Sequence, residues 1–151
     1  MSLNLQLSGD YKVIAFKGEW SHAHTMCKLG EGADLASFRN QEEQDKAMEG
    51  KSSSDAIWIG LGDLHGRNMW TWTDGTSSEW TNWGNTPESG ANCAMIKSGK
   101  WYAESCDKEL KFMCEGPEGI LVSGISILIM IMYSKLSFPC KTRPALYFIE
   151  I

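Results

Sequence analysis

The chain of 151 residues is long enough for one globular domain with a hydrophobic core and too short for two ordinary ones. Its formal net charge is −5: residues 1–118, with 11 basic and 18 acidic residues, carry −7, and residues 119–151 carry +2. Because nucleic-acid binding needs clustered lysine and arginine, this acidic, tryptophan-rich composition argues against a nucleic-acid partner.

Five cysteines indicate disulfide bonds, since none forms a CxxC pair or has the cysteine and histidine spacing of a zinc module. Two bridges would leave one cysteine unpaired, and several connectivities are possible: the cysteines are Cys27, Cys93, Cys106, Cys114 and Cys140. Disulfides favour an extracellular protein. Residues 1–10 show no basic start followed by an apolar stretch, so we expect that the sequence lacks its natural beginning.

The first expected elements are a strand over residues 11–17 and a helix over residues 20–29, which Gly30 can end. One face of this helix carries Trp20, Ala23, Met26 and Cys27. A second short helix is predicted to begin after Asn40, whose side chain can cap it, with Glu43 at the reciprocal capping-box position. The run "AIWIGL" then predicts a buried strand.

Short strands and long loops are expected from residue 61 to residue 101. The run "MWTWTDGT" is typical of a strand that ends in an Asp-Gly turn, and residues 92–102 of a hairpin that turns at Ser98-Gly99. Residues 110–115 predict the last strand, and the domain is expected to end near Pro117. Two helices followed by a meandering β region predict an α+β fold.

The C-terminal tail differs from the rest of the chain. Residues 120–133 form a mostly apolar run of fourteen, shorter than the roughly 20 residues that a membrane-spanning helix needs. Extending the run to residues 119–138 reaches that length but includes Lys135. A membrane anchor, a non-native extension and a packed hydrophobic segment all stay open. We therefore divide the chain into an extension (1–10), a domain (11–117) and a tail (118–151).

Several motifs together resemble the C-type lectin-like domain, from about Tyr11 to Glu115. They are "WIGL" at 58–61, "WTWTDGT" at 70–76, "NCAMI" at 92–96, "KWYAESC" at 100–106 and "FMCE" at 112–115. The resemblance implies two disulfides, Cys27–Cys114 and Cys93–Cys106, which would contribute roughly 4 and 3 kcal/mol on the chain-entropy model. Cys140 lies outside this pattern, as a spare thiol or an inter-chain bridge.

Sugar-binding members of the resembled family hold calcium in a long loop, through a Glu-Pro-Asn or Gln-Pro-Asp triplet, a glutamate shortly before a cysteine and an Asn-Asp pair after a tryptophan. The corresponding positions here are Thr86-Pro87-Glu88, Ala91 and Tyr102-Ala103. Only Glu88 offers a carboxylate, whereas calcium needs six to eight oxygen ligands. We therefore expect no calcium at the usual sugar site and no other cofactor.

The expected function is non-enzymatic recognition of a glycan or of a cell-surface or secreted protein, with membrane contact only if the tail is an anchor. Aromatic residues serve both kinds of ligand. Trp58, Trp70 and Trp72 are expected in the core. The candidate contact residues are Trp80, Trp83, Glu88, Tyr102 and Glu104.

Two other functions are less favoured by the sequence. For an enzyme, His22 and His24 lie two positions apart on a helix and point to different faces, so we expect two exposed histidines with no metal. Asp63 and Asp74 are interpreted as turn residues. For an ice- or mineral-binding protein, the alternating Thr71 and Thr73 are the only hint, and they suit the outer face of a strand.

Overall fold

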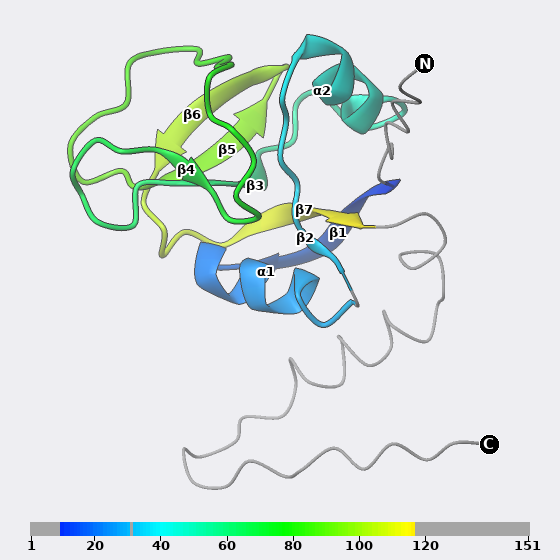
Figure 1. The fold of residues 1–151 in the computed structure, drawn as a ribbon. Coiled ribbons are helices and arrows are strands. Elements are labelled where there is room, and N and C mark those ends of the chain that lie inside the picture. Colours follow the sequence, from blue (N-terminus) through cyan, green and yellow to red (C-terminus); the bar gives the residue numbers. More distant parts are fainter. Residues whose placement is uncertain (1–9, 31, 117–151) are drawn as a thin grey trace, which may run out of the picture.

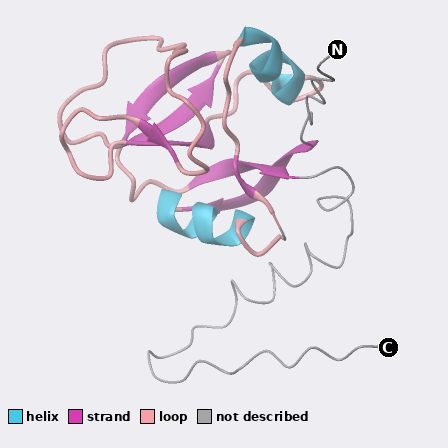
Figure 2. Cartoon of the chain, viewed as in Figure 1, coloured by secondary structure: helices cyan, strands magenta, loops and turns pink. Residues whose placement is uncertain are grey.

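The computed structural model describes residues 10–30 and 32–116, and within them the predicted α+β class is confirmed (Figures 1 and 2). The predictions about Cys140 and about a membrane segment at 119–138 lie outside the described residues. The elements are β1 (Asp10–Gly18), α1 (Trp20–Cys27), β2 (Asp34–Leu35), α2 (Gln41–Met48), β3 (Ile57–Gly62), β4 (Thr71–Trp72), β5 (Cys93–Lys97), β6 (Lys100–Glu104) and β7 (Leu110–Gly116). Neither of the two helices in this part of the chain has the length or apolarity to cross a bilayer.

The strands form one mixed sheet with the order β1-β7-β3-β5-β6, to which β2 adds on β7 and β4 on β3. The pairing of β3 with β7 is parallel, and the other strand pairings are antiparallel. Because β1 runs antiparallel to β7, Asp10 lies opposite Gly116, and the two ends of the described domain meet. The loops between β3 and β5 gather on the other side of the molecule (Figure 1).

Helix α1 packs its predicted face against the sheet. Trp20, Ala23, Met26 and Cys27 are all buried, and the Cys27–Cys114 disulfide joins the end of the helix to β7. The helix ends at Cys27, two residues before the predicted end. The expected exposure of both histidines is wrong, because each is half-buried: the His22 ring packs edge-on against Phe16, and His24 Nε2 lies 3.1 Å from Asp34 Oδ1.

Helix α2 begins where the sequence predicts, with Asn40 as its cap. The Asn40 side chain accepts a hydrogen bond from the Glu43 backbone N–H at 2.9 Å, which satisfies one of the free amides of the first turn. The Glu43 carboxylate reaches back to the backbone N–H of Arg39 at 2.8 Å, one residue beyond the cap. The capping box is therefore present in a form extended by one residue.

Strand β3 divides the core into two clusters, because its side chains alternate between the faces of the sheet. Trp58 faces the cluster under α1, and its indole N–H donates to the Gly18 carbonyl at 3.0 Å. Ile57, Ile59 and Leu61 face the second cluster, which contains the buried Trp72 and Trp101. This second cluster supports the loops that carry the candidate site.

The predicted β structure between residues 69 and 102 is confirmed in part. Only Thr71 and Trp72 of the "MWTWTDGT" run are paired in a strand, because the chain then turns at Gly75, whose φ is 81°. The hairpin of β5 and β6 is confirmed, and its turn places Ser98 at φ 51° and Gly99 at φ 73°. Two successive residues with positive φ match the right-handed twist of the flanking strands.

Candidate ligand pocket

A pocket of about 380 Å³ lies between two loops, the one that follows β3 and the long loop that precedes β5. The pairing of Gly62 with Cys93 brings these loops together, although about thirty residues separate them in the chain. The first loop contributes Asp63, Gly66, Asn68 and Trp70, and the second contributes Pro87, Glu88, Ser89, Gly90, Ala91 and Asn92. The lining thus combines amide, hydroxyl and carboxylate groups with one indole.

Asp63 organises the first loop. Its carboxylate oxygens accept hydrogen bonds from the backbone N–H groups of Arg67 at 3.1 Å and Asn68 at 2.7 Å. Burial raises the pKa of the Asp63 carboxyl, but the N–H donors of Arg67, Asn68 and Met69 together lower it more, so the net pKa lies below the ordinary value. The sequence interpretation of Asp63 as a turn residue is confirmed, and the same residue forms part of the pocket wall.

Two fixed points hold the second loop against the first. The Asp63 backbone N–H donates to the Asn92 carbonyl at 2.8 Å, directly between the loops. The Cys93–Cys106 disulfide, predicted from the sequence, then joins the end of the long loop to the segment after β6. Gly90 has a φ of 90°, a conformation that glycine adopts without strain.

The beginning of the long loop rests on a buried polar network. Gln44 of α2 is only 1% exposed, and its side-chain oxygen accepts from Trp101 Nε1 at 2.7 Å and from Asn82 Nδ2 at 3.3 Å. Asn82 Nδ2 also donates to the Gly99 carbonyl at 3.0 Å. The Asn82 backbone carbonyl accepts from the Trp101 N–H at 3.0 Å. These contacts fix residue 82 against both α2 and the hairpin.

The aromatic candidates lie beside this network. Trp80 and Trp83 are half-buried, and both rings meet the edge or face of Trp101, with centroids 5.1 and 5.9 Å away. Trp83 also packs on Trp70, at 4.7 Å between centroids. Trp72 is in the core as expected, whereas the half-buried Trp70, also expected there, forms part of the pocket wall.

The other sequence-predicted contact residues separate in space. Glu88 lines the pocket. Tyr102 lies against the backbone of Gly84, where an added Cβ would come within 2.5 Å of the ring. Glu104 forms an ion pair with Lys108 at 2.7 Å, and that hydrogen bond is the main cause that holds the pKa of Glu104 below its ordinary value. Of the five candidates, only Glu88 therefore lines the pocket directly.

The sequence matches the family model of the Lectin C-type domain over residues 17–116, which is well over half of the chain. The chain belongs to the C-type lectin domain family. It is 33% identical to the versican core protein of Rattus norvegicus over 113 residues, covering 70% of this chain and 4% of the relative. It is also 33% identical to regenerating islet-derived protein 4 of Mus musculus over 105 residues, covering 64% of this chain and 67% of the relative.

A solved structure agrees with this assignment. The carbohydrate-recognition domain of cow CD23, determined in the presence of a GlcNAc2Man3 oligosaccharide, superposes with a TM-score of 0.64 at 28% identity. The match covers 73% of this chain and 88% of that domain. Because the chain spans only 4% of the versican core protein, such a relative extends far beyond the part that is similar.

The positions that would hold calcium in a sugar-binding C-type lectin domain do not converge here. Glu88 and Ala91 line the pocket, but Ala91 has no side-chain oxygen. Tyr102 is turned toward Gly84, and Ala103 stands between it and the paired Glu104. Across residues 10–30 and 32–116, no group of three or more His, Cys, Asp or Glu side chains could hold a metal ion.

Sequence reasoning missed the contribution of the first loop to the pocket, namely Gly66, Asn68 and Trp70. The available signal was local: Asp63 directly follows a buried strand, and a polar residue at a strand end is well placed to cap a loop. That signal predicts a turn and nothing more. The neighbouring long loop enters only through the pairing of β3 with β5, which residue patterns do not specify.

Proposed function

We propose that this C-type lectin domain is a non-catalytic, extracellular recognition module that binds an uncharged glycan group in the pocket through its own side chains, without calcium. The observation that carries the proposal is the pocket itself, which joins a polar lining to the Trp70 indole between two fixed loops. Its volume falls in the range of small-ligand sites, about 300–1,000 Å³. The two disulfides support an extracellular location.

The chemistry of the lining favours an uncharged, hydroxyl-rich ligand. Asn68, Ser89 and Asn92 offer hydrogen-bond donors and acceptors, and an indole can pack on the apolar face of a sugar ring. Glu88 can accept hydrogen bonds from hydroxyl groups. Among the described residues that line the pocket there is no lysine, arginine or histidine, so a sialylated or sulfated glycan would meet the Glu88 carboxylate without a compensating cation.

Direct recognition is supported by the residues at the calcium-ligand positions. A calcium ion needs several carboxylate and carbonyl oxygens at one point. Here Glu88 is the single carboxylate contributed by those positions, because Ala91, Tyr102 and Ala103 replace the others. Side-chain hydrogen bonds then have to supply the orientation that an ion would otherwise provide.

A catalytic role has less support. His24 pairs with Asp34, and the His22 ring packs on Phe16, so both imidazoles are already engaged in contacts within the domain. The ice- or mineral-binding alternative needs a regular exposed hydroxyl array. Thr73, one half of the Thr71/Thr73 alternation, donates its hydroxyl inward to Asp34 at 2.8 Å.

A glycan array in the presence of calcium and of a chelator tests the proposal. We expect neutral glycans to bind equally in both conditions and anionic glycans to bind less. Substitution Glu88→Ala should weaken binding by roughly tenfold to a hundredfold, since a hydrogen bond to a charged group contributes about 1.5–3 kcal/mol. Glu79→Ala removes an exposed carboxylate outside the pocket and serves as the matched control.

Two results would contradict the proposal. Binding that disappears with the chelator, together with saturable calcium uptake that Glu88→Ala abolishes, would assign the pocket to a calcium site. An array without any binding, combined with retained binding to a protein ligand, would favour the protein-recognition alternative.

A further inference from the structure

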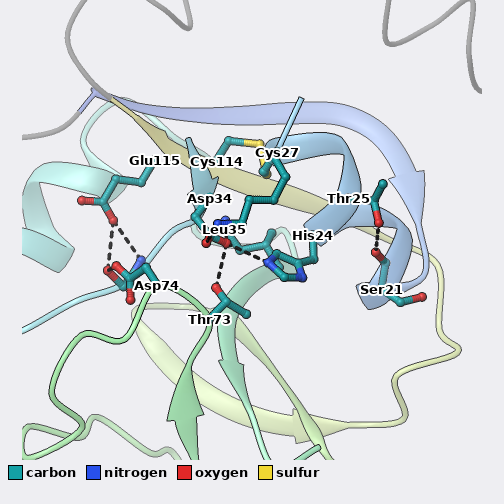
Figure 3. Close-up of polar contacts among 12 residues, drawn as sticks. Ser21, His24, Thr25, Cys27, Asp34, Leu35, Thr73, Asp74, Cys114 and Glu115 are labelled. Carbon is teal, nitrogen blue, oxygen red and sulfur yellow. Dashed lines mark hydrogen bonds and ion pairs between the residues drawn. A yellow bond between two sulfur atoms is a disulfide. The ribbon is translucent and has the colours of Figure 1, made fainter. Parts of the chain in front are cut away.

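A second polar cluster lies away from the pocket, where the turn after β4 meets β7. Its members are Ser37, Asp74, Thr76, Glu115 and Tyr11. Figure 3 shows Asp74 and Glu115 directed at the same point from different elements. The Ser37 hydroxyl stands between them, 2.7 Å from Asp74 Oδ2 and 3.1 Å from Glu115 Oε2.

The cluster has one hydroxyl proton, that of Ser37, between two carboxylates that could each accept one. The Ser37 hydroxyl carries one hydrogen and can donate to only one of its two carboxylate neighbours at a time. The Thr76 hydroxyl and backbone N–H are both directed to Asp74, each at 2.8 Å. Glu115 Oε2 accepts from the Ser37 backbone N–H at 3.1 Å. When both carboxylates are charged and the Ser37 hydroxyl donates its hydrogen bond to Asp74, a lone pair of the Ser37 oxygen faces the Glu115 carboxylate.

The nearby cations whose ion pairs are seen are engaged with other carboxylates. Lys28 and His24 pair with Asp34, and Arg39 pairs with Glu43. Asp34, which faces Glu115 across the β2–β7 register, is occupied by Lys28 and His24.

The remaining neighbour of Glu115 comes from β1 and is uncharged. The Tyr11 hydroxyl donates to Glu115 Oε1 at 3.3 Å. Arg39 and Glu43 affect the pKa of Tyr11 in opposite directions, and they pair with each other at 3.3 Å. The hydrogen-bond donors seen at the two carboxylates, from Ser37, Thr76 and Tyr11, are thus uncharged.

We propose that Glu115 binds a proton as the medium becomes mildly acidic, and that this proton completes a hydrogen-bond chain from Glu115 through Ser37 to Asp74. The Glu115 carboxyl then donates to the Ser37 oxygen, and the Ser37 hydroxyl donates to Asp74. The proton comes from solvent, and no covalent bond changes. The chain fastens the Asp74–Thr76 turn to β7 more firmly in acid than at neutral pH.

The influences on the pKa of Glu115 agree with this geometry. Burial is the largest and raises the pKa, and the charge on Asp74 raises it further. The hydrogen bonds from Ser37 and Tyr11 lower it without cancelling the rise. A carboxyl whose pKa is raised on folding stabilises the protein most below its unfolded value of 4.5, and this contribution is lost as the pH rises through the folded value.

The consequence concerns the half of the molecule that carries the pocket. The Asp74–Thr76 turn lies in the chain between β4 and the half-buried Trp80, which precedes the long loop. A firmer turn restrains the segment that enters this loop. We call this hydrogen-bond chain of Glu115, Ser37 and Asp74 the clasp. It shares no residue with the pocket, and its test does not depend on the identity of the ligand.

Carboxyl-resolved NMR titration of the domain in a chelating buffer tests the clasp. We expect Glu115 to titrate at a higher pH than Glu104, whose pKa is lowered in the same molecule. Asp74→Asn should lower the Glu115 midpoint, whereas Asp107→Asn, an equal charge change at an exposed site, should leave it unchanged. Equal midpoints for Glu115 and Glu104, or no response to Asp74→Asn, would overturn the proposal.

Hydrogen exchange at the Thr76 amide provides a second readout. Because this N–H donates to Asp74, its protection factor should increase on acidification in the parent domain. Ser37→Ala keeps both carboxylates and removes the connecting hydroxyl, so the increase should disappear. Retention of the increase in Ser37→Ala would contradict the chain, and stabilisation at neutral pH by added calcium that Glu115→Gln abolishes would assign the carboxylates to a cation instead.

Discussion

Asp63 connects local chemistry to the candidate pocket at the scale of a single residue. The side chain is 4% exposed, and its carboxylate oxygens are occupied by backbone N–H donors of the loop that it begins. Its own backbone N–H holds the Asn92 carbonyl of the opposite loop. One residue therefore fixes the shape of the first loop and the distance between the two pocket walls.

Asp63→Asn should loosen this loop and weaken ligand binding. One of the two carboxylate oxygens becomes an NH2 group, which would face a backbone N–H donor. In the parent protein the lowered pKa contributes stability above the unfolded value of 3.8, and this is lost as the pH falls through the folded value. Thermal unfolding between pH 2 and pH 6 should show this acid-dependent loss in the parent and less of it in Asp63→Asn. An identical pH profile would contradict the assignment.

Gly84 is a second residue whose role follows from close packing. A methyl group at this position would lie 2.5 Å from the Tyr102 ring, well inside contact distance. Gly84→Ala should destabilise the domain by about 1–3 kcal/mol, as overpacking typically does. In a double-mutant cycle with Tyr102→Ala, denaturant unfolding should show that the cost of the alanine largely disappears. An equal cost in both backgrounds would place the clash elsewhere.

At the scale of elements, α2 supports the long loop without touching the pocket. Gln44 links the helix to Trp101 on β6 and to Asn82 at the loop entrance. Its amide nitrogen also donates to the Gly99 carbonyl in the hairpin turn, at 2.9 Å. Gln41 of the same helix also accepts from Asn82 Nδ2, at 3.3 Å, so α2 holds the hairpin turn and the loop entrance through two side chains.

Gln44→Met tests this support while keeping the side-chain volume. It leaves Trp101 Nε1 without its buried acceptor, and an unpaired buried group of this kind costs about 1–3 kcal/mol. We expect a loss of stability in that range by denaturant unfolding, with weaker ligand binding because Asn82 loses an anchor. Glu42→Met, at an exposed position of the same helix, should cost less. Equal losses would indicate that the effect comes from replacing a polar side chain on the helix by methionine and not from the buried hydrogen bonds.

The elements also separate what residue patterns can predict from what they cannot. The buried face of α1, the Asn40 cap and the Ser98-Gly99 turn each depend on contacts within a few residues, and the sequence predicts all three. The parallel pairing of β3 with β7 and the antiparallel pairing of β3 with β5 join segments that lie far apart in the chain. Hydrophobic alternation identifies such strands without ordering them, so the two walls of the pocket could not be combined beforehand.

The same limit applies to the prediction that Trp70 and Trp72 both lie in the core. Trp70 and Trp72 lie two positions apart in one short run, so an extended strand directs both side chains to the same face, and the pattern predicts the same core environment for both. That Trp70 also borders a pocket depends on the loop that arrives from residues 87–92. The resemblance to the family supplied the disulfide pairing, which cysteine spacing left open, and the structure confirms both bridges.

At the scale of the whole molecule, the two disulfides act on different parts. Cys27–Cys114 closes 87 positions of chain and Cys93–Cys106 closes 13. On the chain-entropy model their removal costs about 4.5 and 3 kcal/mol, respectively. The Cys27–Cys114 bridge joins α1 to β7, and the Cys93–Cys106 bridge holds the end of the long loop.

Paired alanine substitutions separate these roles. Removing Cys27 and Cys114 should lower the midpoint of denaturation more than removing Cys93 and Cys106. Ligand affinity, measured on the folded protein well below either midpoint, should fall mainly in the second variant because Asn92 adjoins Cys93. The opposite order of affinities would contradict the division between scaffold and loop.

The antiparallel pairing of β1 with β7 has a consequence for how the domain is carried. Asp10 and Gly116 are register partners, and the loops between β3 and β5 lie on the other side (Figure 1). A longer polypeptide could therefore enter and leave the domain at one place, on the side away from these loops. Further domains or a linker could then be attached beside β1 and β7 while the loops between β3 and β5 stay exposed to a ligand.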